Sequence, residues 1–343
     1  MAGRASSPVA RRDGGGVMAA LSPAVAACRL AVRQALAGVQ PGGLVLAACS
    51  GGADSLALAS ALAFVAPRSG RRAGLITVDH GLQVGSAERA AEVACWAGRV
   101  GLEPAVAVPV TVDGAGGPEA AARAARYEAL AGTAARLSAV AVLLGHTRDD
   151  QAETVLLALA RGGGPRGIAG MRNRRIIDGV PFIRPFLAVS RAQTRAACTD
   201  LGLSPWEDPH NADPAYARSR LRAALPVLVD TLGPDLVDNL ARTARLVAAD
   251  VEALDALAAS AGTAATEPDG SLDVAALTGL PAAVRTRVLR DLALRLGAPG
   301  AALSSIHIDA LDALVTDWHG QGPVSLPGGI EVGRRGHRLA AHS

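Results

Sequence analysis

The sequence predicts an α/β fold, a doubly wound and mostly parallel sheet, followed by a smaller helical C-terminal domain. Between residues 44 and 146, short apolar runs alternate with segments of helical periodicity, as in βαβ units. The runs are apolar at nearly every position, which is typical of parallel strands buried on both faces. A chain of 343 residues is long enough for two such domains.

Each element has its own signal in the chain. Residues 21–36 have helical apolar spacing, and Pro118-Glu119 makes a favourable first turn for a later helix. The Asp178-Gly179 pair predicts the turn of a hairpin. Strands are expected at 44–49, 74–79, 105–112 and 140–146, and the helices between them are expected to end near residues 66, 100 and 137. Later helices are expected at 234–261, 280–296 and 304–315. A small β unit is expected at 322–341.

Composition excludes several classes of site. All 34 basic residues are arginine, so a Schiff-base lysine and the lysine of a Walker A loop are both excluded. The net charge of +3 permits a nucleic-acid partner without requiring one. Cys28, Cys49, Cys95 and Cys198 form no C-x-x-C pair, which disfavours a zinc ribbon, an iron–sulfur cluster and a disulfide scaffold.

Residues 1–17 are expected to be a disordered tail, followed by an α/β domain at 18–228 and a helical domain at 229–343. The apolar run after Arg12 loosely resembles a lipoprotein signal, but Arg29 and Arg33 follow directly, so a cytoplasmic location is expected. No stretch is long and apolar enough to suggest a membrane span.

The string Ser50-Gly51-Gly52-Ala53-Asp54-Ser55 lies between the first strand and its helix. Adjacent glycines let the backbone approach a ligand closely, and the amides at a helix start form an anion site suited to phosphate. The string is neither G-x-x-x-x-G-K-[ST] nor G-x-G-x-x-G. The simpler alternative is a glycine turn in which Ser or Asp caps the helix.

A second string, HTRDDQAET at 146–154, follows the fourth strand. Thr147 and Asp150 have the spacing of a capping box, which is the simpler explanation. On a helix, however, Asp149, Asp150 and Glu153 share one face. Like charges there destabilise the helix, so a cation or a positively charged substrate is the expected partner.

Two further strings are rich in charge and glycine. Residues 161–171, RGGGPRGIAGM, on their own indicate a linker or an RNA-contacting tail. Residues 206–213, WEDPHNAD, precede Tyr216 and an arginine-rich segment, and on their own indicate a turn into an amphipathic helix.

In this order, the strings resemble the tRNA(Ile)-lysidine synthetase family of the PP-loop ATP pyrophosphatase superfamily. The family pattern is S-G-G-x-D-S, H-x-x-D-D-Q-A-E-T, R-G-x-G-x-x-G-x-x-G-M, R-P-[LF]-L (here 184–187) and W-x-D-P-x-N-x-D. The resemblance covers roughly residues 41–225 and implies an adenine nucleotide α-hydrolase-like fold. It also implies that 18–228 is an ATP-binding catalytic domain and that 229–343 is one C-terminal domain that contacts tRNA. Ser219 departs from the pattern, which has Asn after Arg218, while Arg218 and Arg222 themselves are in place.

The resemblance implies a ligase reaction in two steps. ATP, with Mg²⁺, would adenylate the 2-carbonyl oxygen of the wobble cytosine in the isoleucine tRNA with a CAU anticodon, releasing pyrophosphate. The ε-amine of free L-lysine would then attack C2, and AMP would leave. The target base would be splayed out of the anticodon loop.

The matched positions imply roles for particular residues. ATP would be held by Ser50, Gly51, Gly52, Ala53, Asp54, Ser55, His80 and His146, with Asp54 also on Mg²⁺ through the pyrophosphate. Arg123, Arg126 and Arg218 would stabilise charge on the α-phosphate, and Asp149, Asp150 and Glu153 would bind and deprotonate lysine. The tRNA would be held by Arg161, Arg166, Arg184, Arg191 and Arg222, with binding that weakens steeply with salt.

The sequence leaves alternatives open. The chain could be another PP-loop tRNA-modifying enzyme such as a thiolase, an amidotransferase, or a non-catalytic ATP-binding regulatory protein. Pyrophosphate release separates them, because a sensor gives none and an amidotransferase gives it without tRNA. The oligomeric state is also open, with a homodimer among the options, as is which carboxylate serves as the base.

Overall fold

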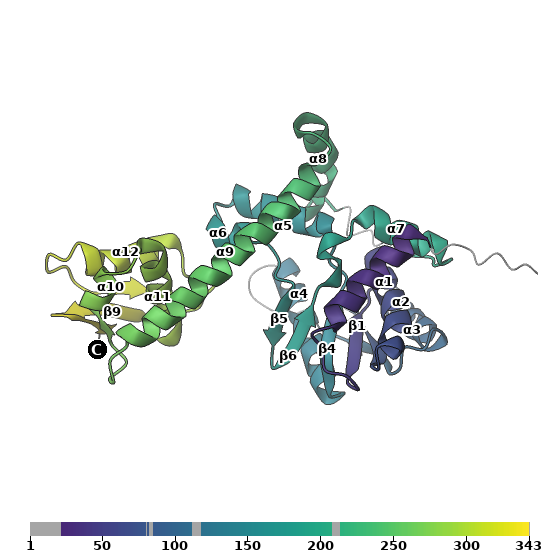
Figure 1. Ribbon diagram of the computed structural model, residues 1–343, viewed down its shortest axis with the longest axis horizontal. Helices are drawn as coiled ribbons and strands as arrows, with labels where there is room; N and C mark the ends of the chain where they lie inside the picture. The colour runs from purple at the N-terminus through teal and green to yellow at the C-terminus, as the bar shows by residue number, and fades with distance from the viewer. Residues whose placement is uncertain (1–21, 80, 82–84, 112–117, 208–212, 343) are drawn as a thin grey trace, which may run out of the picture. The chain divides into compact units, whose positions relative to one another are not determined.

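The computed structural model describes residues 22–79, 81, 85–111, 118–207 and 213–342. They form two compact units (Figure 1). The first unit is Met1–Gln151 with Asn173–Pro234, and the second is Ala152–Arg172 with Asp235–Ser343. The predicted tail at 1–17 and His80 lie outside the described residues.

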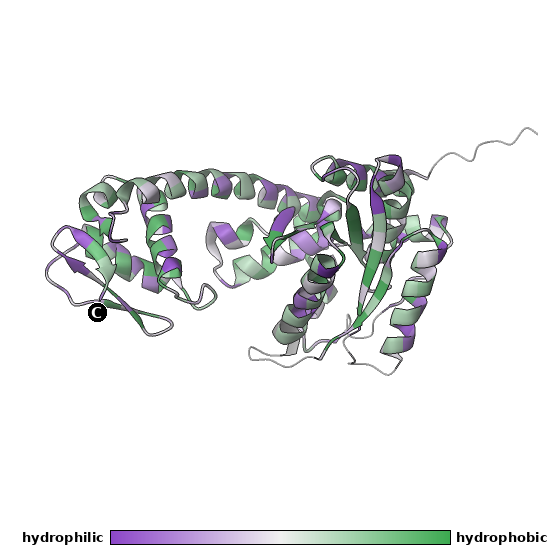
Figure 2. Ribbon diagram, turned by 90° about the horizontal axis from the view of Figure 1, so that it is seen from below, coloured by the Kyte–Doolittle hydropathy of each residue, from purple (hydrophilic) through white to green (hydrophobic). Residues whose placement is uncertain are grey.

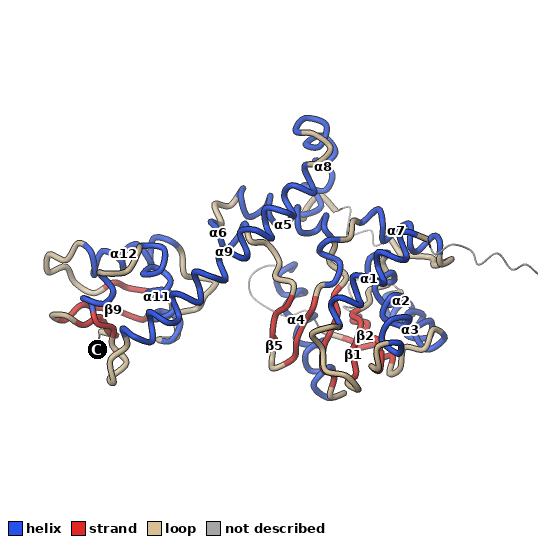
Figure 3. The backbone as a smooth tube through the Cα atoms, in the orientation of Figure 1, coloured by secondary structure: helices blue, strands red, loops and turns tan. Residues whose placement is uncertain are grey.

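The described part of the first unit is built on a six-stranded sheet of order β3-β2-β1-β4-β6-β5. Figure 3 shows the strands of this sheet in red. Its strands are β1 (Leu44–Ala48), β2 (Arg72–Asp79), β3 (Ala105–Pro109), β4 (Ala139–Leu144), β5 (Arg174–Ile177) and β6 (Val180–Ile183). Neighbouring strands are parallel except for the β5–β6 hairpin. The order in which the chain adds strands reverses between β1 and β4, which makes this the topological switch point of the sheet. Open α/β sheets bind ligands beyond the carboxyl ends of the strands at such a point.

Helices cover both faces of this sheet. In β1, Val45 and Ala47 pack into a core with α1, α2, α3 and α7, while Leu44 and Leu46 pack into a second core with α4. The strands are accordingly hydrophobic along most of their length (Figure 2). The helices of this unit are α1 (Pro23–Leu36), α2 (Ala53–Arg68), α3 (Ser86–Arg99), α4 (Pro118–Arg136), the start of α5 (Arg148–Ala160), the 3-10 helix η1 (Pro185–Ala188), α7 (Arg191–Asp200) and α8 (Ala217–Leu232).

The α/β prediction is confirmed, including the Asp178-Gly179 turn, where both residues have positive φ angles of 48° and 78°. The uniform double-sided burial expected of the strands is wrong for β3. That strand lies at the edge of the sheet and is only partly buried. The predicted boundary between residues 228 and 229 falls inside α8, which runs through Pro226 to Leu232, and the first unit ends a few residues later, at Pro234.

The second unit has its own core. Its elements are the remainder of α5, α6 (Gly164–Ile168), α9 (Leu236–Ala265), β7 (Leu272–Asp273), α10 (Val274–Thr278), α11 (Ala282–Arg295), α12 (Ser305–Thr316), β8 (Val324–Leu326), β9 (Ile330–Arg335) and β10 (Arg338–Ala341). Its described strands form a four-stranded antiparallel sheet of order β7-β10-β9-β8. The predicted helices and terminal β unit are therefore present, and α6, β7 and α10 were not anticipated.

Candidate active site

The loop after β1 is closed on itself by serine hydroxyls. Ser55 Oγ donates to the Gly52 carbonyl oxygen at 2.9 Å and accepts from the Ser50 amide at 3.2 Å. Gly51 has a φ of 85°, and a Cβ added there would meet Val93 at 3.3 Å. No described side chain caps α2, so the amides of its first turn are available to an anion.

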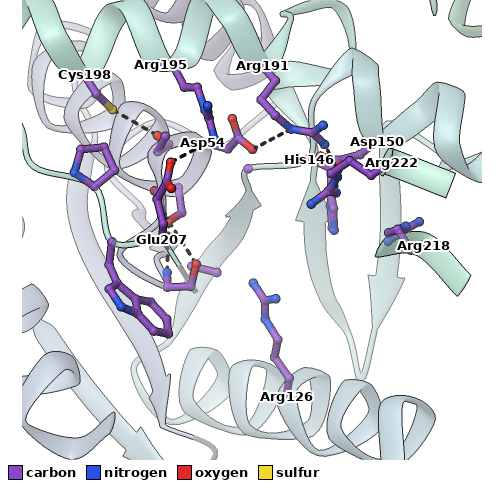
Figure 4. A pocket seen from close by; sticks show the side chains of 18 of the residues that line it. Asp54, Arg126, His146, Asp150, Arg191, Arg195, Cys198, Glu207, Arg218 and Arg222 are labelled. Atoms are coloured by element: carbon purple, nitrogen blue, oxygen red, sulfur yellow. Dashed lines mark hydrogen bonds and ion pairs between the residues drawn. The ribbon is translucent and has the colours of Figure 1, made fainter. Parts of the chain in front are cut away.

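A cavity of about 800 Å³ lies in the first unit, beyond the carboxyl ends of β1 and β4 (Figure 4). Its lining continues from the loop after β1 to α4, α7 and α8. Among the described residues, the predicted site residues that line it are Ser50, Gly52, Ala53, Asp54, Ser55, Arg123, Arg126, His146, Asp150, Arg191, Arg218 and Arg222. The fold therefore brings together predicted residues from five separate parts of the sequence at the sheet's switch point.

The cavity is predominantly cationic. In the described lining, the arginines at 123, 126, 191, 195, 218 and 222 outnumber the carboxylates of Asp54, Asp150 and Glu207. Arg126 points into the space from α4 (Figure 4), and burial lowers the pKa of its guanidinium. Such a surplus of positive charge favours a polyanionic ligand.

Asp54, in the first turn of α2, is held by α7. Its carboxylate accepts a hydrogen bond from the Thr194 hydroxyl and lies 3.9 Å from Arg191 Nε. Burial raises the pKa of Asp54 to about 6, although the Thr194 hydrogen bond opposes the shift. Burial thus disfavours the ionised form of Asp54, and a cation bound in the cavity would stabilise it.

The capping box predicted at the start of α5 is present. The Thr147 amide donates to Asp150 Oδ2 at 2.8 Å, and the Asp150 amide donates to Thr147 Oγ1 at 3.4 Å. The other oxygen, Oδ1, lies 2.8 Å from Arg191 Nη2 and 3.5 Å from Arg222 Nη2. Burial opposes the charge, but Arg191 and the Thr147 amide outweigh it and lower the pKa of Asp150. The Asp150 side chain thus caps α5 with one oxygen and contacts the cavity arginines with the other.

The three carboxylates of this helix have different surroundings. Asp150 lines the cavity, whereas Asp149 Oδ2 accepts the Arg191 amide at 2.8 Å. Glu153 is fully buried, and it is not among the described residues that line the cavity.

Two arginines predicted to bind tRNA have positions inside the first unit. Arg184 is only 4% exposed, and its Nε donates to His146 Nδ1 at 3.2 Å while its Nη2 donates to the Tyr127 hydroxyl at 3.2 Å. Arg191 bridges toward Asp54 and Asp150 in the cavity. Neither is placed as a surface contact for a nucleic-acid backbone, because partners within the unit hold both guanidinium groups.

Arg161 and Arg166 belong to the second unit. Arg161 Nε donates to the Leu157 carbonyl oxygen at 3.0 Å, and Arg166 lies 2.6 Å from Asp255. Both side chains are exposed. The glycine-rich string at 161–171 includes the short helix α6 and is therefore not simply a linker.

Sequence reasoning missed several lining residues, namely Gly145, Arg195, Cys198, Thr199, Pro205, Trp206 and Glu207, and the Asp54 partner Thr194. Trp206 could have been predicted, because it is the first residue of the W-x-D-P string. In the structure, its amide donates to the Gly51 carbonyl oxygen at 2.9 Å. No sequence motif pointed to Gly145, although a Cβ at this position would meet the Asp54 carbonyl group at 3.1 Å. Only the fold reveals that close approach.

Two kinds of feature are absent from the described residues. No helix in the described ranges is long and apolar enough to cross a membrane. No group of three or more His, Cys, Asp or Glu side chains among these residues is arranged to hold a metal ion by itself.

A strand, a glycine loop and an uncapped helix start beside a cationic cavity define a PP-loop nucleotide-binding protein. A family model described as a PP-loop domain matches residues 29–228, and one described as a TilS substrate binding domain matches residues 272–340. Among solved structures, a U34-tRNA thiolase from Methanococcus maripaludis with its [4Fe-4S] cluster shares the fold, with a TM-score of 0.54 and 17% identity over 65% of this chain and 80% of that chain.

Curated relatives narrow the class further. A tRNA(Ile)-lysidine synthase from Salinispora tropica is 64% identical over 94% of this chain and 98% of its own length. Those of Thermobifida fusca and Streptomyces coelicolor are 56% and 54% identical, each over 92% of this chain and 95% and 97% of their own lengths. The chain belongs to the tRNA(Ile)-lysidine synthase family, whose members are ATP-using, ligase-type enzymes of tRNA modification.

Proposed function

We propose that this protein joins free L-lysine to C2 of the wobble cytidine of the isoleucine tRNA with a CAU anticodon. The cytosine 2-carbonyl oxygen attacks the α-phosphorus of ATP, and pyrophosphate leaves. The lysine ε-amine then attacks C2, and the oxygen departs with AMP. The observation that carries the proposal is one cavity that joins the PP-loop to Asp54, Asp150 and a ring of arginines.

The first step uses the loop and the arginines. The amides of the Ser50–Ser55 loop would hold the β- and γ-phosphates at the positive end of α2. Arg123, Arg126 and Arg218 would stabilise charge on the α-phosphate, where one well-placed arginine accelerates related phosphoryl transfer about 10³-fold or more. Arg191 and Arg222 extend the same cationic lining.

Mg²⁺ fits the donor set of this cavity. In proteins the ion is commonly held by one or two carboxylates together with substrate phosphates, and Asp54 supplies a cavity-lining carboxylate of this kind. The ion would neutralise charge on the pyrophosphate leaving group. The role of Asp54 is to keep an ionised oxygen beside the loop that holds those phosphates.

Asp150 is the favoured partner of the lysine ammonium. It is the member of the Asp149, Asp150 and Glu153 set that lines the cavity in the described residues, and its lowered pKa keeps it ionised. Arg191, 2.8 Å away, would have to share or release this carboxylate when the substrate enters. The base that deprotonates the ammonium would come from the same carboxylate set.

The tRNA would be bound by exposed arginines such as Arg161 and Arg166 and by the second unit, and the enzyme would work in the cytoplasm. The thiolase alternative is not favoured, because the curated relatives that match more than nine-tenths of this chain are tRNA(Ile)-lysidine synthases, whereas the thiolase is only 17% identical. A homodimer is a further option that the cavity does not require.

Pyrophosphate release tests the proposal. The purified protein is incubated with ATP and Mg²⁺, with or without the CAU isoleucine tRNA, and a tRNA with a changed wobble base is the control. Release should need the CAU tRNA and should be unaffected by omitting lysine in the first turnover. Release that is independent of tRNA would support an amidotransferase, and no release under any condition would support a regulatory ATP-binding protein.

A further inference from the structure

His146 has a defined hydrogen-bonding state. It follows β4 at the switch point of the sheet and lines the cavity. Its Nδ1 lies 3.2 Å from Arg184 Nε, a group that is only a donor. Nδ1 must therefore accept, so the proton of the neutral ring is on Nε2.

Arg184 is itself held in place. Its Nη2 donates to the Tyr127 hydroxyl at 3.2 Å, and that hydroxyl also accepts from Arg123 Nη2 at 3.4 Å. Tyr127 packs against Phe182 at 5.7 Å between ring centroids. Since Arg184 is 4% exposed, its guanidinium has little freedom to turn away from the imidazole.

The surroundings also keep the ring neutral. The charged groups that act on it are Asp150 from α5, Arg184 from the segment after β6, and Arg126 and Arg123 from α4. Burial and the three arginines outweigh the opposing carboxylate and lower the pKa of His146 to about 3. A second proton, on Nδ1, would in addition have to displace the donor from Arg184.

We propose that Arg184 is a positioning residue that fixes His146 as a permanently neutral hydrogen-bond donor, whose Nε2–H binds a phosphate oxygen of ATP during adenylation. This inference rests on the proposed function for the identity of the acceptor. The ring then acts as a fixed dipole and does not transfer a proton. A preorganised donor of this kind typically contributes about 10²–10³-fold to the rate.

Nuclear magnetic resonance of the full chain with ¹⁵N-labelled histidine tests the tautomer without any substrate. Comparison with His146→Gln identifies the His146 signals among the seven histidines. We expect the Nε2–H tautomer and constant ¹⁵N shifts between pH 5.5 and 8. A protonated Nδ1 in the neutral ring, or titration within this range, would overturn the proposal.

Arg184→Met tests the positioning role with the same spectra. Removing the donor should allow the Nδ1–H tautomer to appear and should move the pKa of His146 upward, because Arg184 lowers it. Folding is verified by the unchanged signals of the other histidines. If His146 keeps one tautomer and its pKa in a folded Arg184→Met protein, Arg184 does not position it.

Two substitutions test donation to ATP. Glutamine places an amide donor near the position of Nε2, whereas asparagine reaches only the position of Nδ1 and can still accept from Arg184. His146→Gln should retain tRNA-dependent pyrophosphate release within about 10-fold, and His146→Asn should lower it about 10²–10³-fold. Equal losses in both would refute the donor role.

The proposed function can fail separately. If the wild-type protein released no pyrophosphate with the CAU tRNA, the reaction assigned above would be wrong, while the tautomer and the Arg184→Met spectra would still report on the fixed donor. In that case, a shift of the His146 Hε2 signal on adding ATP and Mg²⁺ would decide whether the ring binds the nucleotide. Unchanged spectra at saturating ATP would refute it.

Discussion

At the scale of the residue, Asp54 carries a conflict between stability and function. Its carboxylate is at the start of α2, yet its pKa is raised to about 6 because burial penalises the charge more than Thr194 and Arg191 stabilise it. The folded protein therefore binds this proton more tightly than the unfolded chain does. The stabilising effect is complete below the ordinary pKa of 3.8 and is lost as the pH rises through about 6.

Replacing Asp54 with Asn removes that penalty. At pH 8, Asp54→Asn should be more stable than the wild type by up to about 3 kcal/mol, and the difference should shrink toward pH 4. Scanning calorimetry at both pH values measures it. The same variant should lose pyrophosphate release while keeping its affinity for tRNA. Loss of tRNA binding as well would show that Asp54 is mainly a structural group.

Asp150 allows a prediction about lysine. Asp150→Asn can still cap α5 through its carbonyl oxygen, but it loses the charge that would hold an ammonium. Charge-assisted hydrogen bonds are worth roughly 1.5–3 kcal/mol, so the lysine concentration for half-maximal lysidine formation should rise about 10–100-fold. Pyrophosphate release in the first turnover should change little.

Asp149→Asn and Glu153→Gln are the matched comparisons for Asp150→Asn. Each removes one carboxylate from the same helix, but neither residue lines the cavity in the described structure. The lysine effect should be largest at Asp150. Equal effects at all three positions would mean that the charge of the helix start, and not a particular carboxylate, recruits the substrate.

At the scale of the element, the site depends on how closely β4 approaches α2. A Cβ on Gly145 would meet the Asp54 carbonyl group at 3.1 Å and Ser55 Cα at 3.2 Å, all backbone atoms that cannot rotate away. The glycine thus allows the end of β4 to lie against the helix start that presents the phosphate-binding amides. The PP-loop geometry consequently involves two strands and not only the loop itself.

Gly145→Ala should therefore weaken ATP binding, although Gly145 lies outside the Ser50–Ser55 loop. Overpacking of this kind typically costs about 1–3 kcal/mol, and we expect a comparable loss of stability with about 10-fold weaker ATP binding. Gly132→Ala is the control, because a Cβ there, on α4, meets nothing within 4 Å. Calorimetric titration with ATP compares the two. If Gly145→Ala changed neither stability nor ATP affinity, the end of β4 would be able to move away from α2 at no cost.

Elements with a strong local signal were the predictable ones. The apolar runs of β1, β2 and β4 and the helix at α1 carry their signal in their own residues. The elements β7 and α10 do not, since β7 has two residues and is paired only with β10 among the described strands. The roles of Thr194, Arg184 and Gly145 depend on partners far along the chain, so spacing could not predict them.

At the scale of the whole molecule, the sequence places the main boundary close to the observed one at Pro234, but it does not assign an internal segment to the second unit. Residues 152–172 belong to the second unit, because α6 packs on α9 and Arg166 and Arg172 lie 2.6 and 3.6 Å from Asp255. Arg287 lies 3.0 Å from the same carboxylate. Arg166, Arg172 and Arg287 thus form a basic cluster around Asp255, and the exposed Arg161 belongs to the same unit.

These exposed arginines are predicted to bind tRNA, whereas the cavity of the first unit is predicted to bind ATP. Arg161→Ala and Arg166→Ala should each weaken tRNA binding and reduce the slope of log K against log salt by about 0.7–0.9, as expected for one lost phosphate contact. The affinity for ATP should be unchanged. Asp255→Asn, which removes the negative partner, should leave tRNA binding intact or strengthen it. Unchanged tRNA affinity and slope in both arginine variants would contradict the assignment.

The most direct test of the whole account is transfer of labelled lysine. The purified protein is incubated with ATP, Mg²⁺, [¹⁴C]lysine and CAU isoleucine tRNA, and the digested tRNA is analysed for the modified nucleoside. We expect one labelled nucleoside at the wobble position, formed with one AMP and one pyrophosphate, and none with Asp54→Asn. Pyrophosphate release without any label in the tRNA would contradict the central claim that the cavity ligates lysine to cytidine.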